Sequence, residues 1–222
     1  MSTLLQTVEI ETAPNPTAAI IVLHGLGADG NDFVPICNEL DLDAVGPVRY
    51  VFPHSPHRPV TVNGGMVMPA WYDIKGFGLV DQEDEAGLRQ SQAQISALIE
   101  REIERGIAPQ RIVLMGFSQG CAMTLMTGLR YPARLAGLVC LSGYLPLASK
   151  LAAERHAANA DVPIFMGHGR MDPVVQIARG TATRDALLKF GYAVEWHEYP
   201  MQHSVHPQEI ADLNRWLVAR LG

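Results

Sequence analysis

The chain has 222 residues, and its 17 Lys and Arg against 23 Asp and Glu give a net charge of −6 with histidine neutral. Its composition is 48% apolar and 18% charged, which excludes a disordered chain and provides the material for one large core. The acidic balance, without a run of Lys or Arg, argues against nucleic acid or anionic membrane surfaces as partners. A single domain over residues 1–222 is expected, because sheet-based domains of this length are often undivided.

Cysteine usage and the N-terminal sequence indicate the compartment. Cys37, Cys121 and Cys140 cannot all pair, and none has the spacing of a zinc site. No basic segment followed by a long apolar one opens the chain, so no secretory signal is expected. These features favour a reducing, cytoplasmic location. The uncharged stretch Ile112–Leu129 contains several glycines and polar residues, which favours a buried strand and helix over a membrane span.

Short apolar runs rich in β-branched residues alternate with helical patterns, which is typical of an α/β fold with a mostly parallel sheet and helices on both faces. Strands are predicted at Leu5–Ile10, Ala18–Leu23, Val48–Phe52, Arg111–Met115, Leu135–Leu141, Val162–Met166 and Ala193–Tyr199. The first alternates and is placed at the sheet edge. Helices are predicted over roughly Gln82–Arg105, Gln119–Arg130, Val174–Phe190 and Pro207–Leu221. The segment Pro53–Gly78 fits neither pattern and is predicted to be a long functional loop.

The sequence Gly116-Phe117-Ser118-Gln119-Gly120 lies between a predicted strand and a predicted helix. In this context G-x-S-x-G is typical of a nucleophile elbow, a sharp turn that exposes a serine and requires small residues on either side. The alternative is an ordinary glycine-rich turn. Ser118 is therefore the predicted nucleophile, placed where the N-terminus of a helix favours negative charge.

A serine nucleophile needs a base, and the base needs an orienting carboxylate. Asp172 follows the strand Val162–Met166 and so lies at the same sheet edge as Ser118. Its alternative role is to cap the helix that follows. Asp161 precedes its strand and Asp185 lies in the middle of a predicted helix, so both are poorer candidates for the acid.

Two histidines, His203 and His206, follow the last predicted strand. Spacing favours His203 as the base, because His206 directly precedes Pro207 and is suited to starting the final helix; both remain open on spacing alone. The His-x-x-His spacing also resembles a metal pair, but no third ligand has a suitable context, so no metal site is predicted.

An oxyanion hole normally combines the N–H of the residue after the nucleophile with one from a loop after an early strand. These criteria select the backbone amides of Gln119 and Leu26, the latter within His24-Gly25-Leu26-Gly27-Ala28-Asp29-Gly30. For His24, holding this loop by a hydrogen bond is favoured over a part in catalysis.

The chain resembles the carboxylesterase/acyl-protein thioesterase (phospholipase/carboxylesterase) family of α/β-hydrolases over nearly its full length. The matching motifs, in order, are His24 to Gly30, Phe52 to Pro56 with Val60 to Gly65, Pro69-Ala70-Trp71-Tyr72-Asp73, Gly116 to Gly120, Gly167-His168-Gly169 with Asp172 to Val175, and Tyr199-Pro200-Met201-Gln202-His203. The resemblance implies the α/β-hydrolase fold, with Ser118 as nucleophile, Asp172 as acid, His203 rather than His206 as base, and Leu26 and Gln119 as oxyanion donors. The family tends to have a second glycine where this chain has Cys121.

The resemblance further implies hydrolysis of short- to medium-chain carboxylic esters through an acyl-enzyme, without a cofactor. Thioesterase and lysophospholipase activities remain alternatives, as do a peptidase or dienelactone-type hydrolase and a catalytically silent binding module. The substrate partner would be a small acyl ester or thioester, and a homodimer stays open. The segment Asn63–Gly78 resembles the family's acyl-binding loop. Met66, Val67, Met68 and Trp71 are thus candidate substrate-binding residues, with core packing as the alternative for each.

Overall fold

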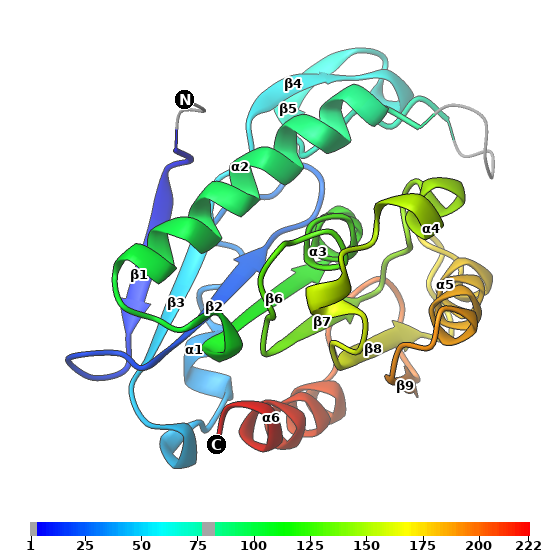
Figure 1. Ribbon diagram of the computed structural model, residues 1–222. Coiled ribbons are helices and arrows are strands. Elements are labelled where there is room, and N and C mark those ends of the chain that lie inside the picture. Colours follow the sequence, from blue (N-terminus) through cyan, green and yellow to red (C-terminus); the bar gives the residue numbers. More distant parts are fainter. Residues whose placement is uncertain (1–3, 77–82) are drawn as a thin grey trace.

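A twisted sheet forms the centre of the computed structural model, which describes residues 4–76 and 83–222 (Figure 1). The strand order in its described part is β1-β3-β2-β6-β7-β8-β9. These strands are β1 (Thr7–Glu11), β2 (Ala18–Leu23), β3 (Val48–Pro53), β6 (Ile112–Phe117), β7 (Gly137–Leu141), β8 (Ile164–Gly169) and β9 (Val194–Tyr199). All pair in parallel except β1, which is antiparallel to β3 at the edge, so the predicted mostly parallel sheet is confirmed.

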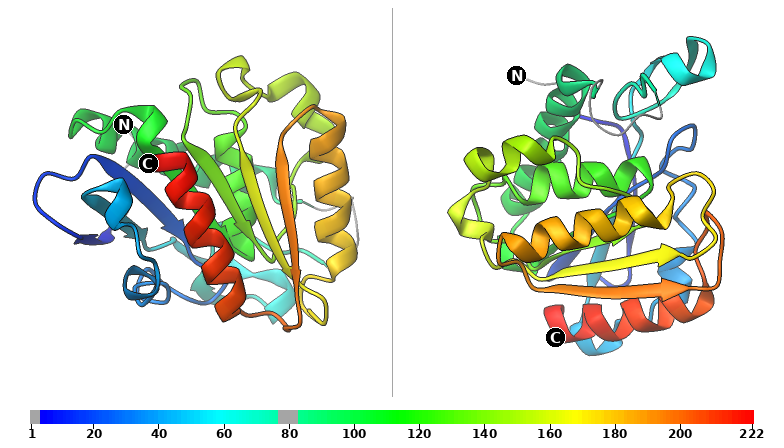
Figure 2. Two further views of the ribbon diagram at one scale, coloured as in Figure 1. Left: turned by 90° about the horizontal axis from the view of Figure 1, so that it is seen from below. Right: turned by 90° about the vertical axis from the view of Figure 1, so that its right-hand side faces the viewer.

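Helices cover both faces of the sheet (Figure 2). One face carries α2 (Glu85–Glu104), α3 (Gln119–Gly128), α4 (Leu151–Glu154) and α5 (Ile177–Lys189), and the other carries α1 (Ile36–Glu39) and α6 (Pro207–Leu221). Side chains alternate between the faces along a strand. In β2, Ile21 and Leu23 pack with the first group of helices, while Ile20 and Val22 pack with the second. This double burial explains the continuous apolar runs in the sequence.

The prediction of one long loop over Pro53–Gly78 is wrong in part. The structure contains an antiparallel hairpin there, formed by β4 (His57–Val60) and β5 (Met66–Pro69). Its turn uses Gly64 and Gly65, whose positive φ angles of 67° and 78° suit glycine. The prolines in both strands obscured the pattern in the sequence, because proline is normally a poor strand residue.

Most predicted boundaries differ from the observed ones by one to three residues, which is the usual uncertainty at element ends. The strand before the predicted elbow begins at Ile112 and continues through Phe117. The third predicted helix begins at Ile177 rather than Val174. The predicted helix start at Gln82 lies outside the described residues. The uncharged stretch Ile112–Leu129 folds as β6 and α3. Among the helices that the structure describes, none has the length and apolar composition to cross a membrane.

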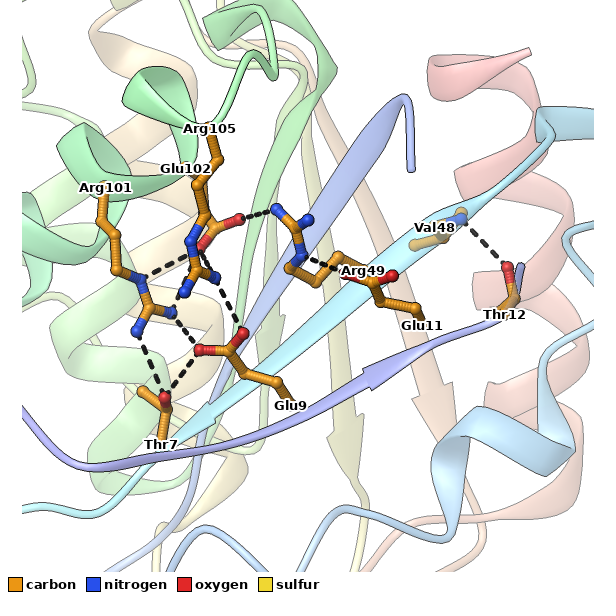
Figure 3. Close-up of polar contacts among 9 residues, drawn as sticks. All are labelled: Thr7, Glu9, Glu11, Thr12, Val48, Arg49, Arg101, Glu102 and Arg105. Carbon is orange, nitrogen blue, oxygen red and sulfur yellow. Dashed lines mark hydrogen bonds and ion pairs between the residues drawn. The ribbon is translucent and has the colours of Figure 1, made fainter. Parts of the chain in front are cut away.

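A network of charges attaches the edge strand β1 and its neighbour β3 to α2 (Figure 3). Glu102, on α2, is fully buried and accepts a 2.8 Å hydrogen bond from Arg49 of β3. Arg101 and Arg105 donate to the same carboxylate at 3.1 and 3.2 Å. Both arginines also pair with Glu9 of β1, at 2.9 and 2.8 Å. The buried carboxylate is thus compensated by three cations that join the helix to the sheet edge.

Candidate active site

Ser118 occupies a strained turn between β6 and α3, with φ 57° and ψ −115°. A positive φ is costly for a residue with a side chain, and such strain concentrates at functional sites. The flanking glycines are required by close packing. A Cβ at Gly116 would lie 2.2 Å from the carbonyl oxygen of Gly120, and a Cβ at Gly120 would lie 2.0 Å from that of Leu23. The predicted elbow geometry is therefore present around Ser118.

Asp172 and His203 meet at the same edge of the sheet, on the loops that follow β8 and β9. The Nδ1 atom of His203 lies 2.6 Å from Oδ2 of Asp172, whose carboxylate is buried. Oδ1 of Asp172 accepts hydrogen bonds from the N–H groups of Val174 and Val175, both at 2.8 Å. The predicted helix-capping role is not observed, because α5 begins at Ile177 after Gln176, and Asp172 instead shapes the turn before the helix. The other oxygen of its carboxylate faces the ring of His203.

The ring of His203 is held next to the elbow. Its centroid lies 4.7 Å from that of Phe117, the residue directly before Ser118. His206 instead begins α6, since its Nδ1 accepts a 3.1 Å hydrogen bond from the N–H of Gln208. Another nearby ring, that of His168, donates from Nε2 to the carbonyl oxygen of Val175 at 2.7 Å. Burial lowers the pKa of His168, so this ring stays neutral.

The loop after β2 approaches Ser118 closely. A Cβ at Gly25 would lie 3.5 Å from Cβ of Ser118. His24 fixes this loop: its Nδ1 donates to the carbonyl oxygen of Gly25 at 2.7 Å, and its Nε2 accepts from the N–H of Ser55 at 3.1 Å. Burial lowers the pKa of His24, which keeps the ring neutral and able to accept. The bonds of His24 are those of a loop-holding residue, and they fix the loop at the point where Gly25 passes Ser118.

The side chain of Gln119 has a structural part that the sequence did not reveal. Its Oε1 accepts from the N–H of Trp71 at 2.8 Å, and its Nε2 donates to the carbonyl oxygen of Tyr72 at 2.7 Å. Ser91 donates to the carbonyl oxygen of Trp71. Gln119 thereby ties the segment after the hairpin to the elbow. No local pattern could have indicated a pairing between residues so far apart in sequence.

The four predicted substrate-binding residues lie in different environments. Trp71 is fully buried, and its indole N–H donates to the carbonyl oxygen of His24 at 2.9 Å. Core packing, the alternative role, therefore describes Trp71. Met66 and Val67 are 63% and 62% exposed on the hairpin. Met68 is half-buried, and its sulfur lies 4.0 Å from the Cβ position of Gly27 in the loop after β2. Phe77 and Gly78, at the end of the predicted acyl-binding loop, lie outside the described residues.

All three cysteines are free thiols. Cys121 follows the elbow and is fully buried. A Cβ added at Gly143 would lie 2.4 Å from the Cβ of Cys121. The thiol therefore fills a tight space between α3 and the chain after β7 and does not face solvent. Burial raises the pKa of Cys140 and, to about 11, that of Cys37. In residues 4–76 and 83–222, no group of three or more His, Cys, Asp or Glu side chains could hold a metal ion.

Comparisons by family, by sequence and by structure all identify relatives of the same kind. The model of the phospholipase/carboxylesterase family matches residues 6–220. Acyl-protein thioesterase 1 of Neurospora crassa is 42% identical over 214 residues, which cover 92% of this chain and 87% of that protein. Acyl-protein thioesterase 1 of Yarrowia lipolytica is 39% identical over 207 residues, which cover 90% of this chain and 91% of that protein. The crystal structure of Arabidopsis thaliana SOBER1 superimposes with a TM-score of 0.88 at 31% identity, covering 92% and 99% of the two chains. These likenesses confirm the predicted α/β-hydrolase fold.

Proposed function

The chain belongs to the phospholipase/carboxylesterase family of α/β-hydrolases, which are serine hydrolases of esters or thioesters, and on this premise we propose that Ser118, His203 and Asp172 form its catalytic triad. The observation that carries the proposal is the 2.6 Å contact between His203 and the buried Asp172, beside a serine held at positive φ. The chain order nucleophile, acid, histidine is that of α/β-hydrolases.

The proposed reaction has two halves. In the first half, the hydroxyl oxygen of Ser118 attacks the substrate carbonyl while His203 removes the hydroxyl proton, and the tetrahedral intermediate forms. His203 then gives that proton to the departing alcohol or thiol, and the acyl group remains on Ser118. In the second half, water loses a proton to His203 and attacks the acyl-enzyme, and return of the proton to Ser118 releases the acid. Each half returns His203 to its neutral state.

Asp172 is the positioning residue of this triad. Its Oδ2 faces Nδ1 of His203, so it favours the tautomer in which Nδ1 carries the proton and Nε2 is free to accept from Ser118. Two backbone N–H groups on Oδ1 fix the carboxylate in turn. The negative charge of Asp172 also stabilises the imidazolium that forms when His203 takes the proton.

The backbone N–H groups of Leu26 and Gln119 are the proposed oxyanion donors. Gln119 is the first residue of α3, and N–H groups in the first turn of a helix have no partner within that helix. Leu26 lies in the loop that passes beside Ser118. A donor of this kind is worth about 2.7–4 kcal/mol of transition-state stabilisation.

The proposed substrates are short- to medium-chain acyl esters, with the acyl chain along the hairpin. Met66, Val67 and Met68 supply the apolar surface, and Trp71 supports it from the core. Hydrolysis of acyl-protein thioesters is the second candidate function, favoured by relatives named acyl-protein thioesterase 1. Free thiols at all three cysteines support a cytoplasmic location for either activity.

An acyl-chain series of p-nitrophenyl esters and matched thioesters tests the proposal. Wild-type protein should turn over both series, and the Ser118→Ala variant should not rise above the uncatalysed rate. A fluorophosphonate probe should label Ser118 and should fail to label the variant. Equal turnover by both proteins would refute the assignment of the nucleophile, and absence of both turnover and labelling would favour a binding module on a hydrolase fold.

A further inference from the structure

A cavity of about 280 Å³ borders His203 on the side of the elbow that faces α1 and α6. Its apolar walls include Phe33 and Phe117, which are partly buried and pack against the core cluster beneath these two helices. Trp71, which follows the β4–β5 hairpin, belongs to the cluster on the other face of the sheet. Figure 2 shows the same separation, with the hairpin and the pair α1 and α6 on opposite sides. The proposed acyl site does not account for this cavity.

The proposed mechanism indicates which part of a substrate would lie there. His203 gives its proton to the leaving oxygen or sulfur, so the leaving group must lie against His203. The acyl chain departs from the same carbonyl carbon toward the hairpin. Small-molecule sites commonly occupy roughly 300–1,000 Å³, so a cavity of about 280 Å³ suits a fragment of a substrate.

The cavity has an acidic rim. Asp32 and Glu39 both line it and are exposed. Neither carboxylate takes part in a hydrogen bond or an ion pair with any residue of the described ranges 4–76 and 83–222. The chain contains no Lys or Arg in residues 1–48, nor in residues 190–214, the two segments that form most of the walls. Within the described residues, the two carboxylates of this rim are therefore not paired with a cation, and both contribute negative potential at the mouth of the cavity.

Aromatic rings connect the rim to the proposed base. The centroids of Phe33 and Phe117 are 5.7 Å apart, and Phe117 lies 4.7 Å from His203. Faces of aromatic rings attract organic cations, and carboxylates at the mouth add to the attraction. An organic ammonium group meets both requirements, since its alkyl surface packs on rings while its charge faces Asp32 and Glu39.

We propose that this cavity is the leaving-group subsite and that Asp32 and Glu39 make it selective for esters and thioesters whose alcohol or thiol carries an organic cation. The inference rests on the proposed triad, because His203 locates the leaving group. It assigns specificity for the leaving group to the α1 side of the elbow, independently of the acyl chain.

Two thioesters that differ only in charge test the subsite. S-Butyrylthiocholine carries a trimethylammonium group, and S-(3,3-dimethylbutyl) thiobutyrate has a carbon atom in place of the nitrogen, so acyl chain and shape are matched. The quantity measured is the ratio of kcat/KM for the cationic to the neutral substrate. Wild-type protein should prefer the cation by about five- to tenfold at low salt, a magnitude set by exposed charge and cation–π interactions. Rising NaCl concentration should reduce the preference through screening.

The double variant Asp32→Asn, Glu39→Gln should lower this ratio to below about twofold. The matched control Asp41→Asn, Asp43→Asn removes the same charge from exposed residues of the same segment that do not line the cavity, and should keep the wild-type ratio. A wild-type ratio near one, or a preference that survives in the first variant, overturns the subsite. An equal fall of the kcat/KM ratio in both double variants would show that the preference depends on overall charge, and would also overturn the subsite. If neither thioester is hydrolysed faster by wild-type protein than by Ser118→Ala, the proposed function itself fails and the subsite fails with it.

Discussion

The side chain of Gln119 offers a sharp test of how the elbow supports the rest of the site. It is 3% exposed, and it bonds both the N–H of Trp71 and the carbonyl oxygen of Tyr72. The Gln119→Ala substitution removes both partners and keeps the backbone amide of residue 119. A defect in this variant therefore reports on the tie between the elbow and the hairpin segment, and not on the loss of an oxyanion donor.

The magnitude follows from the number of buried groups that lose a partner. Each unsatisfied buried donor or acceptor costs about 1–3 kcal/mol, so two such groups cost about 2–6 kcal/mol of the free energy of unfolding. Water entering the vacated space would bring the value toward the lower end. Looser placement of the hairpin should also lower kcat/KM for butyrate esters by about tenfold or more, because small displacements near reacting atoms are costly.

Urea unfolding gives the change in free energy, and p-nitrophenyl butyrate kinetics give the change in kcat/KM. Thr124 provides a control, since it is a fully buried residue of the same helix whose hydroxyl has no hydrogen-bond partner among the residues that the structure describes. The Thr124→Val variant should unfold within about 1 kcal/mol of wild type, because it removes no satisfied group. A Gln119→Ala variant within about 0.5 kcal/mol of wild type, with unchanged kinetics, would refute the reasoning.

The pH dependence of the Gln119→Glu variant adds a second check. A protonated carboxyl at this position can still donate to the carbonyl oxygen of Tyr72, whereas an ionised one would face it with an unpaired negative charge. Its pKa in the folded state should therefore be raised above the unfolded value. Stability relative to wild type should fall as pH rises from 5 to about 8, and a pH-independent difference would contradict the geometry.

Three further predictions concern other polar groups. The Glu102→Ala substitution should cost about 2–4 kcal/mol in urea unfolding, because it leaves the partly buried Arg49 and Arg101 without their shared carboxylate. Glu104→Ala on the exposed face of α2 should change stability by less than about 0.5 kcal/mol. Burial raises the pKa of Glu209 from 4.5 to about 8, so the folded state holds a proton that the unfolded state loses, and stability should fall by up to about 1.4 kcal/mol per pH unit across that range. The Glu209→Gln variant should lack this slope, and parallel curves for the two proteins between pH 5 and pH 8 would contradict the assigned burial. The Asp172→Asn substitution should lower kcat on the order of 10⁴-fold, because it holds His203 in the wrong tautomer. The fold should be retained, since Asn can still accept from the N–H groups of Val174 and Val175. A loss of kcat below tenfold would exclude Asp172 as the orienting acid.

The sheet was predictable because its strands carry strong local signals. β2 was predicted residue for residue, since six consecutive buried apolar residues stand between polar turns. α6 was also predicted from end to end, from Pro207 in its first turn and one apolar face. The positions of Ser118 and Asp172 follow from the same signals, because residues that directly follow parallel strands gather at one edge of the sheet.

The hairpin and the tie through Gln119 could not be predicted in the same way. In β4 and β5, Pro59 and Pro69 counter the local preference for strand, and pairing of the two strands with each other supplies the stability instead. The contact of Gln119 with Trp71 joins elements that only the folded chain brings together. The burial of Trp71 has the same origin: a large aromatic residue in a glycine- and proline-rich segment is compatible with a binding surface and with the core, and only the packing around His24 distinguishes them.

The arrangement around the elbow suggests that the two halves of a substrate can be selected separately. The hairpin is fixed to the elbow through Gln119 and to the loop after β2 through the 2.9 Å hydrogen bond from the N–H of Gly27 to the carbonyl oxygen of Pro69. A shift of the hairpin would therefore move the proposed oxyanion loop, which couples acyl-chain fit to the rate of the chemical step. The carboxylates of Asp32 and Glu39 form no hydrogen bond or ion pair with the described residues, so replacing them breaks no contact that holds the proposed oxyanion donors. Changes on the hairpin should consequently alter kcat, whereas changes on the rim should act mainly on KM for charged leaving groups.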